Sequence, residues 1–206
     1  MEPEKPDRRI KYTKMVLKQA LLELMSGKPI NQITIKELCD LADVNRGTFY
    51  KHYNDQYDLL RQIQNELDSE IKSTIEKNLA GAPSSSKIIT EIIRCIAEQS
   101  SLCKILFSKY GDADFLKKIM YNAHDESINE WKTKSMQGDT RQYEMFYTFI
   151  ANGIAAVVQN WLESDMKEEP QEIAVFIDNA TNYGLSFFLC KQGEAGGRFI
   201  RSKEPR

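Results

Sequence analysis

The stretch 34–53 constrains the fold more than any other part of the chain, because it contains two helical patterns separated by a turn. In the first, Thr34 and Glu37 have the spacing of a capping box, in which a hydroxyl and a carboxylate satisfy each other's backbone amides. In the second, Asn45 is a favourable N-cap for a helix over residues 46–52. These signals predict a helix-turn-helix.

The outer face of the second predicted helix is unusual for a helix with a purely structural role. Val44 and Phe49 can face inward, which leaves small, basic and aromatic side chains outside. A helix of this kind can enter the major groove of DNA. Residues 8–53 carry nine Lys or Arg and four Asp or Glu, whereas residues 54–206 have a net charge of −5. This asymmetry predicts a basic nucleic-acid reader on an acidic body. The outward residues are Arg46, Gly47, Thr48, Tyr50, Lys51 and His52.

The sequence VNRGTFYKHY, preceded by TIKELCDLAD and followed by NDQYDLL, closely resembles the TetR-type (TetR/AcrR) transcriptional regulators. The resemblance is strong over the first third of the chain and continues further only in helical character and length. It implies a homodimeric regulator, a repressor, that binds a palindromic operator in double-stranded DNA. It also implies a small-molecule effector that releases the operator.

The remaining sequence has helical periodicity and no convincing strand pattern, so the expected fold class is all-α. A three-helix DNA-binding domain is expected over residues 1–54, with residues 1–7 disordered. A helical-bundle domain for regulation and dimerisation follows over residues 55–191, with a disordered tail at 192–206. The stretch 80–86, AGAPSSS, is a predicted linker. Helices are expected at about 9–26, 55–79, 87–99, 101–110, 112–134 and 141–163, and from Pro170 onward.

DNA-binding roles follow from residue chemistry and from the resemblance. Arg46 is the first choice for a base contact, because a guanidinium pairs bidentately with guanine O6 and N7. Asn45 can read adenine, but its use as a cap is favoured. Gln56 stands where the family commonly has a lysine, which removes one ionic phosphate contact. Lys36 matches a family position that reaches bases or phosphates. The residues that match phosphate-contacting positions of the family are Thr34, Thr48, Tyr50, Lys51 and His52. Gly47 belongs to the same predicted DNA-binding set.

The last two predicted helices are apolar over more surface than one bundle face can cover. A second copy of the chain would bury the excess in a four-helix interface, as the resemblance also implies. The alternative is that both helices form the core of a monomer. The expected interface residues are Phe146, Ile150, Gly153, Val157, Trp161, Ile177, Ala180, Gly184, Phe187 and Phe188.

The predicted helix 112–134 suggests where an effector could bind. An aromatic cavity with one titratable group would suit a small, partly apolar ligand. The alternative is a packed core with a hydrogen-bonded histidine. The candidate ligand-binding residues are Phe107, Tyr110, Met120, His124, Trp131 and Tyr147.

Several function classes find no support in the sequence. Neither histidine lies in a metal-binding pattern, and no nucleophile, P-loop or dinucleotide motif is present, so neither an enzyme nor a cofactor is expected. Four scattered cysteines, no apolar run of about 18 residues and no signal peptide indicate a cytoplasmic protein without a membrane partner. The alternative function is an interaction protein that keeps the helix-turn-helix fold but acts through another regulator, with weak or no DNA binding.

Overall fold

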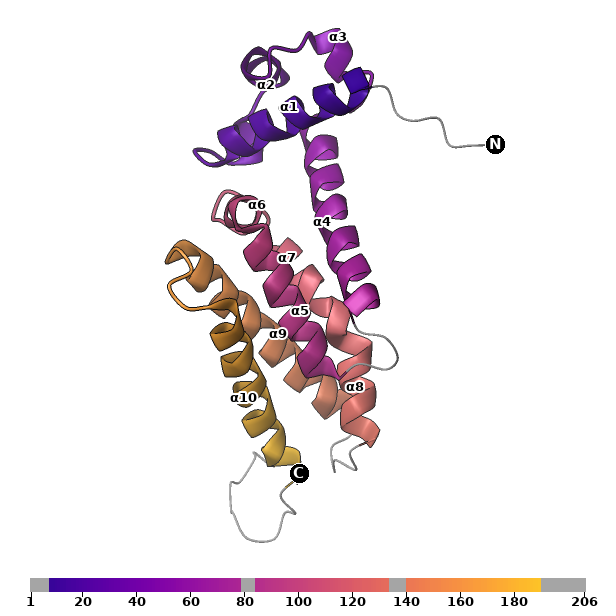
Figure 1. Ribbon diagram of the computed structural model, residues 1–206, viewed down its shortest axis with the longest axis vertical. Helices are drawn as coiled ribbons and strands as arrows, with labels where there is room; N and C mark the ends of the chain where they lie inside the picture. The colour runs from indigo at the N-terminus through magenta and orange to yellow at the C-terminus, as the bar shows by residue number, and fades with distance from the viewer. Residues whose placement is uncertain (1–7, 79–83, 134–139, 190–206) are drawn as a thin grey trace, which may run out of the picture.

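The computed structural model describes residues 8–78, 84–133 and 140–189, and all regular structure within these ranges is helical (Figure 1). The predictions for residues 1–7 and 192–206 lie outside the described residues, as does most of the predicted linker. No helix in the described ranges is long and apolar enough to cross a membrane. The fold is all-α, as predicted.

Three helices at one end of the molecule form a unit that we call the reader: α1 (Arg8–Met25), α2 (Ile35–Leu41) and α3 (Arg46–Phe49). A short 3₁₀ helix, η1 (Ile30–Gln32), connects α1 to α2. The apolar stripe of α1 packs onto α2, and Phe49 of α3 is completely buried in the same core. The reader therefore has an apolar centre that fixes its three helices relative to one another.

The long helix α4 (Gln56–Asn78) leaves the reader and runs along the rest of the molecule (Figure 1). It contacts α1 near its beginning and α5 further along. An ion pair of 3.1 Å between Lys18 Nζ and Glu66 Oε2 also joins α1 to α4. The position of the reader is therefore tied to the position of α4.

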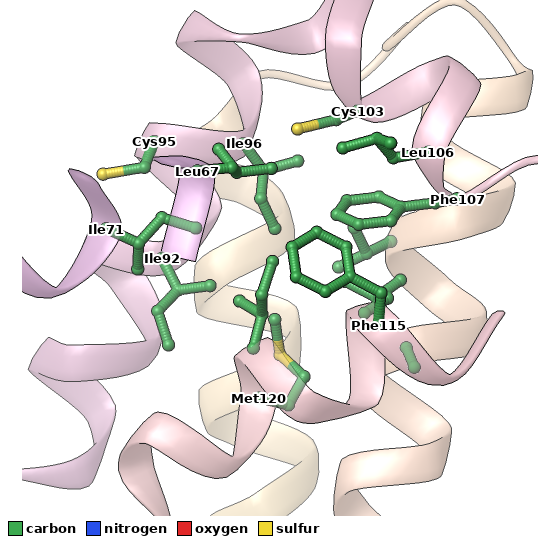
Figure 2. Close-up of a cluster of buried hydrophobic side chains, with 14 of the residues drawn as sticks. Leu67, Ile71, Ile92, Cys95, Ile96, Cys103, Leu106, Phe107, Phe115 and Met120 are labelled. Atoms are coloured by element: carbon green, nitrogen blue, oxygen red, sulfur yellow. The ribbon is translucent and has the colours of Figure 1, made fainter. Parts of the chain in front are cut away.

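The remaining helices form the body. The helix α5 contacts both α4 and α10, while α9 packs against α6, α7 and α8. Figure 2 shows how side chains of α4, α5, α6 and α7 meet in one apolar cluster, with the rings of Phe107 and Phe115 6.0 Å apart. Because Leu67 and Ile71 of α4 belong to this cluster, α4 shares its core with the body. The body consists of α5 (Ser85–Glu98), α6 (Ser100–Leu106), α7 (Ala113–Met120), η2 (Tyr121–Ala123), α8 (His124–Thr133), α9 (Thr140–Glu163) and α10 (Pro170–Leu189).

Three predicted helix lengths were wrong. The helix expected over 101–110 ends already at Leu106. The expected continuous helix over 112–134 is divided by the 3₁₀ turn η2 into α7 and α8. At this point the Tyr147 hydroxyl donates to the Met120 carbonyl, and the Asn122 amide donates to Asp68, so tertiary contacts define the break. The recognition helix ends at Phe49 rather than His52, because the amides of Lys51 and His52 bond three residues back to Thr48 and Phe49.

Candidate nucleic-acid interface

The first helix of the motif begins with the predicted capping box, which the structure confirms. The Glu37 amide donates to Thr34 Oγ1 over 3.2 Å, and the Thr34 amide donates to Glu37 Oε2 over 3.0 Å. Lys28 Nζ lies 2.7 Å from Glu37 Oε1. The bonds from Lys28 and Thr34 lower the pKa of Glu37 to about 2. The Thr34 hydroxyl also donates to Glu37, so a phosphate contact by this side chain would compete with the cap.

The turn between the two helices has the geometry that its residues favour. Asp43 has a φ of 51°, in the left-handed region that aspartate reaches more readily than most residues. The Asn45 side chain accepts from the Gly47 amide over 2.7 Å and so caps α3. The predicted cap by Asn45 is therefore confirmed, while adenine reading by Asn45 stays the less favoured prediction.

The second helix exposes the predicted DNA-facing side chains. Arg46, Gly47 and Lys51 are exposed, while Thr48 and His52 are half-buried. Tyr50 is 59% exposed, as expected for an outward residue, whereas Tyr53 is buried. Burial raises the pKa of Tyr53 to about 12, so its hydroxyl stays neutral beneath the reader surface.

Three cations on the motif remain available for phosphates or bases. Lys36 on α2, Arg46 on α3 and Lys51 in the following turn are exposed, and none forms an ion pair within the described parts of the chain. Lys28, in contrast, is neutralised by Glu37. Unpaired cations on a capped helix-turn-helix can approach a polyanion without first breaking an internal ion pair.

The start of α4 is locally acidic, because Asp55 and Asp58 flank Gln56. Asp58 accepts from the Asn54 amide over 3.0 Å and donates its own amide to Asp55 Oδ1 over 2.7 Å. The backbone hydrogen bond from Asn54 lowers the pKa of Asp58 despite some burial, so the carboxylate stays charged. Gln56 lies beside it and is only half-buried. A reduced phosphate contact at this corner stays a prediction.

Five large apolar side chains on α9 and α10 are exposed, and we call this set the outer strip. It consists of Met145, Phe149, Val175, Phe176 and Tyr183, with exposed fractions that reach 71% at Phe149 and 79% at Tyr183. Met145 and Phe149, with Thr148, Asn152 and Gly153, also line a shallow hollow. Sequence periodicity missed these five residues as interface candidates.

The predicted interface residues are not those of the outer strip, and they lie partly at the surface and partly inside the subunit. Gly153 and Ala180 are exposed, and Phe146, Ile150, Val157 and Gly184 are half-buried. Trp161 and Ile177 are only 2% exposed, so their side chains belong to the core of the subunit. The prediction that these two residues lie at the interface is therefore wrong. The side chains of Phe187 and Phe188 lie outside the described parts. A Cβ at Gly184 would lie 2.8 Å from the Phe146 ring, so this glycine serves packing within the subunit.

The predicted effector residues fall into two groups. Met120, Trp131 and Tyr147 line one small cavity of about 10 Å³ between α5, α7, α8, α9 and α10, which holds roughly one water molecule. Phe107 is buried against Phe115, and Tyr110 lies under the Lys109 ammonium, 4.8 Å from its ring centre. Neither Phe107 nor Tyr110 is among the lining residues.

His124 lies beside this cavity instead of lining it. Its Nδ1 is 2.8 Å from Asp125 Oδ1, and its Nε2 is 2.8 Å from Glu144 Oε2 on α9. Its ring stacks on Tyr121 and meets the Tyr147 ring edge-on at 4.8 Å. Partial burial disfavours the charged imidazole, but the bonds to Glu144 and Asp125 prevail and raise the pKa of His124. This arrangement matches the alternative of a hydrogen-bonded histidine.

Fold and surface together define an all-helical protein with an N-terminal helix-turn-helix on a larger helical body. Residues 84–183 match the TetR-type family model described as the transcriptional regulator C-terminal region. A 51-residue segment is 33% identical to the uncharacterized HTH-type transcriptional regulator YxbF of Bacillus subtilis (strain 168), and it covers 25% of this chain and 13% of that protein. The chain therefore resembles the TetR-type transcriptional regulators over residues 84–183, and an HTH-type regulator over the 51-residue segment.

Solved structures share the fold over most of the chain. The dihydroxyacetone kinase operon activator DhaS superposes with a TM-score of 0.60 at 18% identity, over 85% of this chain and 97% of that one. A TetR transcriptional regulator from Streptococcus agalactiae 2603V gives a TM-score of 0.60 at 18% identity, over 85% of this chain and 96% of its own. At these identities the likeness is one of fold.

Proposed function

We propose that this regulator binds a palindromic DNA operator as a homodimer and represses transcription in the cytoplasm. The observation that carries the proposal is the set of unpaired, exposed cations on the capped helix-turn-helix: Lys36, Arg46 and Lys51. A dimer with two such readers suits two half-sites one helical turn apart, or about 34 Å.

Within each half-site we assign the base contact to Arg46. It is the first residue of α3, it is exposed, and Asn45 before it is committed to the cap. Lys51 and the exposed Tyr50 are placed to bind phosphates, which fix register more than sequence preference. Lys36 can add a contact from α2.

The outer strip supports a second copy of the chain as the dimer partner. Exposed apolar patches of this kind on a soluble protein commonly mark an interface. Gly153 adds to this argument, because a Cβ there would meet no atom within 4 Å, so nothing within the described subunit requires a glycine. A helix glycine costs about 1 kcal/mol relative to alanine, and close approach of a partner helix would account for it.

We propose repression because a dimer seated over an operator can exclude polymerase by occupancy alone, whereas activation also requires a contact with polymerase. DhaS is named as an activator, so a reporter gene under the operator decides the sign. We further propose that a small neutral effector enters the cavity by displacing its lining, since none of the described lining residues is charged.

An electrophoretic shift with DNA from upstream of the chain's own coding region tests the proposal. Arg46→Ala should weaken binding by about 1–3 kcal/mol, roughly 5- to 150-fold, through the lost guanine contact. Lys51→Ala should lower the salt slope by about one. Lys87→Ala removes an exposed charge from α5 of the body and serves as the control. Absence of a shift at any salt concentration would favour the interaction protein instead.

The dimer has its own test. Phe149→Glu combined with Phe176→Glu places charges on the outer strip without touching the reader. Sedimentation equilibrium should show a dimer for the parent chain and a monomer for the double variant. A parent chain that stays monomeric at micromolar concentration would refute the dimer.

A further inference from the structure

The first half of α1 projects from the reader without taking part in its core. No side chain of residues 8–16 is buried, and the first buried residue of α1 is Leu17. At the usual rise per residue of an α-helix, this overhang is about 13.5 Å long. A short helical segment is marginal in water without packing, so we expect its sequence to serve a requirement other than the core.

The overhang carries a row of cations along one side. Arg8, Lys11 and Lys14 follow each other at intervals of three residues, which places them on neighbouring positions of one helix face. All three are exposed, and none forms an ion pair within the residues that the structure describes. Lys18, the next cation along this face, is neutralised by Glu66 at 3.1 Å. The free charge is thus confined to the projecting part, and we call Arg8, Lys11 and Lys14 the α1 ridge.

The order of charges in α1 is the reverse of the order that stabilises a helix. Its first turn contains no acid, and its single acid, Glu23, lies near the other end. The helix macrodipole favours anions at the N-terminus, and like charges three residues apart repel each other. The α1 ridge therefore destabilises its own helix unless an anion binds there. Local conflicts of this kind are expected at functional sites.

The start of α4 offers no comparable free cation. Asp55 and Asp58 flank Gln56, and the guanidinium of Arg61 in the next turn lies 3.6 Å from Asp58. A phosphate that approached this corner would meet carboxylates first. Contacts to a DNA backbone are therefore expected from other parts of the reader.

We infer that the α1 ridge is a second DNA-binding surface of the reader, which binds phosphates of the same duplex outside the groove that α3 enters. Leu17 of α1 and Phe49 of α3 are completely buried in one apolar cluster, so the ridge keeps a fixed distance from Arg46. Figure 1 shows the beginning of α1 at the same end of the reader as α3. The ridge replaces an anchor at the start of α4 and lengthens the DNA segment that each subunit covers. This role rests on the proposed function, since it requires α3 to enter a groove.

The surroundings of the α1 ridge favour DNA over an acidic protein as its partner. The ridge lies on the same rigid unit as three further unpaired cations, Lys36, Arg46 and Lys51, so one polyanion can engage all of them. Tyr12, which follows Lys11, is 63% exposed, and a phenol hydroxyl can donate to a phosphate oxygen.

The salt dependence of binding tests the ridge. The double variant Lys11→Gln, Lys14→Gln removes two of its charges, and glutamine has nearly the helix propensity of lysine. Fluorescence anisotropy with two duplexes of equal length, one from upstream of the chain's coding region and one of random sequence, should show a salt slope lowered by about two for both. The control is Lys87→Gln with Lys132→Gln, which removes two exposed charges from α5 and α8 of the body and should leave the slope unchanged.

Hydroxyl-radical footprinting locates the contact on the upstream duplex. The Lys11→Gln, Lys14→Gln variant should lose protection at sugars that flank each half-site, whereas Arg46→Ala should weaken protection of the whole site. Uniform weakening by both variants would overturn a contact outside the groove.

Unfolding without DNA supplies a further measurement. Because the α1 ridge opposes the macrodipole, the Lys11→Gln, Lys14→Gln variant should be at least as stable in urea as the parent chain. A less stable variant would assign these lysines to the fold and overturn the inference. An unchanged salt slope in a parent that binds DNA would also overturn it, in favour of an acidic protein partner, and would leave the proposed function intact. A parent that binds neither duplex at any salt concentration would refute the proposed function together with the ridge.

Discussion

The two ion pairs of His124, with Asp125 and Glu144, lead to a prediction about how stability depends on pH. The perturbation is His124→Gln, which removes an imidazole held between Asp125 and Glu144. These carboxylate side chains are 88% and 47% exposed, so each pair contributes about 0.2–1 kcal/mol. Loss of the edge-on contact with Tyr147 at 4.8 Å adds about 0.5–1.5 kcal/mol. The expected total loss in acid is therefore about 1–3.5 kcal/mol.

The pH dependence separates the ionic part from the packing part. Both ring nitrogens face carboxylates, and only the protonated imidazole can donate to both. Because the pKa of His124 is raised in the folded state, its ionic contribution is complete below the ordinary value of 6.5. That contribution is lost as pH rises through the higher folded value. The stability difference between parent and His124→Gln should therefore be largest near pH 5.5 and smaller near pH 9.

Urea unfolding at fixed protein concentration measures this difference at both pH values, since a dimer would make stability depend on concentration. His52→Gln is the control, because His52 is the chain's other histidine and contacts no carboxylate within the described residues. A His124→Gln deficit that is equal at the two pH values would refute the reasoning. It would mean that the substitution removes only packing, and that the ion pairs of the protonated imidazole contribute nothing to stability.

Three further predictions follow from packing. Phe49→Ala should destabilise the reader by about 3–5 kcal/mol and abolish DNA binding through unfolding, as circular dichroism would show. In the Phe149→Glu, Phe176→Glu background, which removes the proposed partner, Gly184→Ala should be less stable than Gly153→Ala by about 1 kcal/mol or more in urea unfolding. The reason is that its new methyl group meets the Phe146 ring, whereas the methyl at Gly153 meets no atom of its own subunit. Cys103 should resist iodoacetamide at pH 8 until the protein unfolds, because it is fully buried and desolvation raises its pKa to about 12. Mass spectrometry of labelled peptides would detect any earlier reaction.

Local signals made the motif predictable from the sequence. The capping box of Thr34 and Glu37 and the Asn45 cap both depend on residues within a few positions of each other. The inward direction of Phe49 follows from helical spacing alone. Such features can be predicted from the sequence because they do not depend on contacts with distant parts of the chain.

Features set by distant contacts could not be predicted in the same way. The break between α7 and α8 coincides with hydrogen bonds from Tyr147 and toward Asp68, which lie far away in the sequence. On α9 apolar residues occur nearly all round the helix, so periodicity gives no unique outer face. The prediction selected Phe146 and Ile150, whereas the neighbouring positions Met145 and Phe149 are the more exposed ones. One residue is a rotation of about 100°.

The helix α3 is so short that the residues that maintain its shape differ from the residues that could contact DNA. A helix of four residues cannot offset its own nucleation cost, so its shape is imposed by Asn45, Phe49 and Tyr53. The side chains that would meet DNA, Arg46 and Tyr50 among them, are not the ones that maintain this shape. New operator preferences could therefore evolve by replacing outward residues alone, with little loss of stability, while a peptide cut from this motif would have no defined structure.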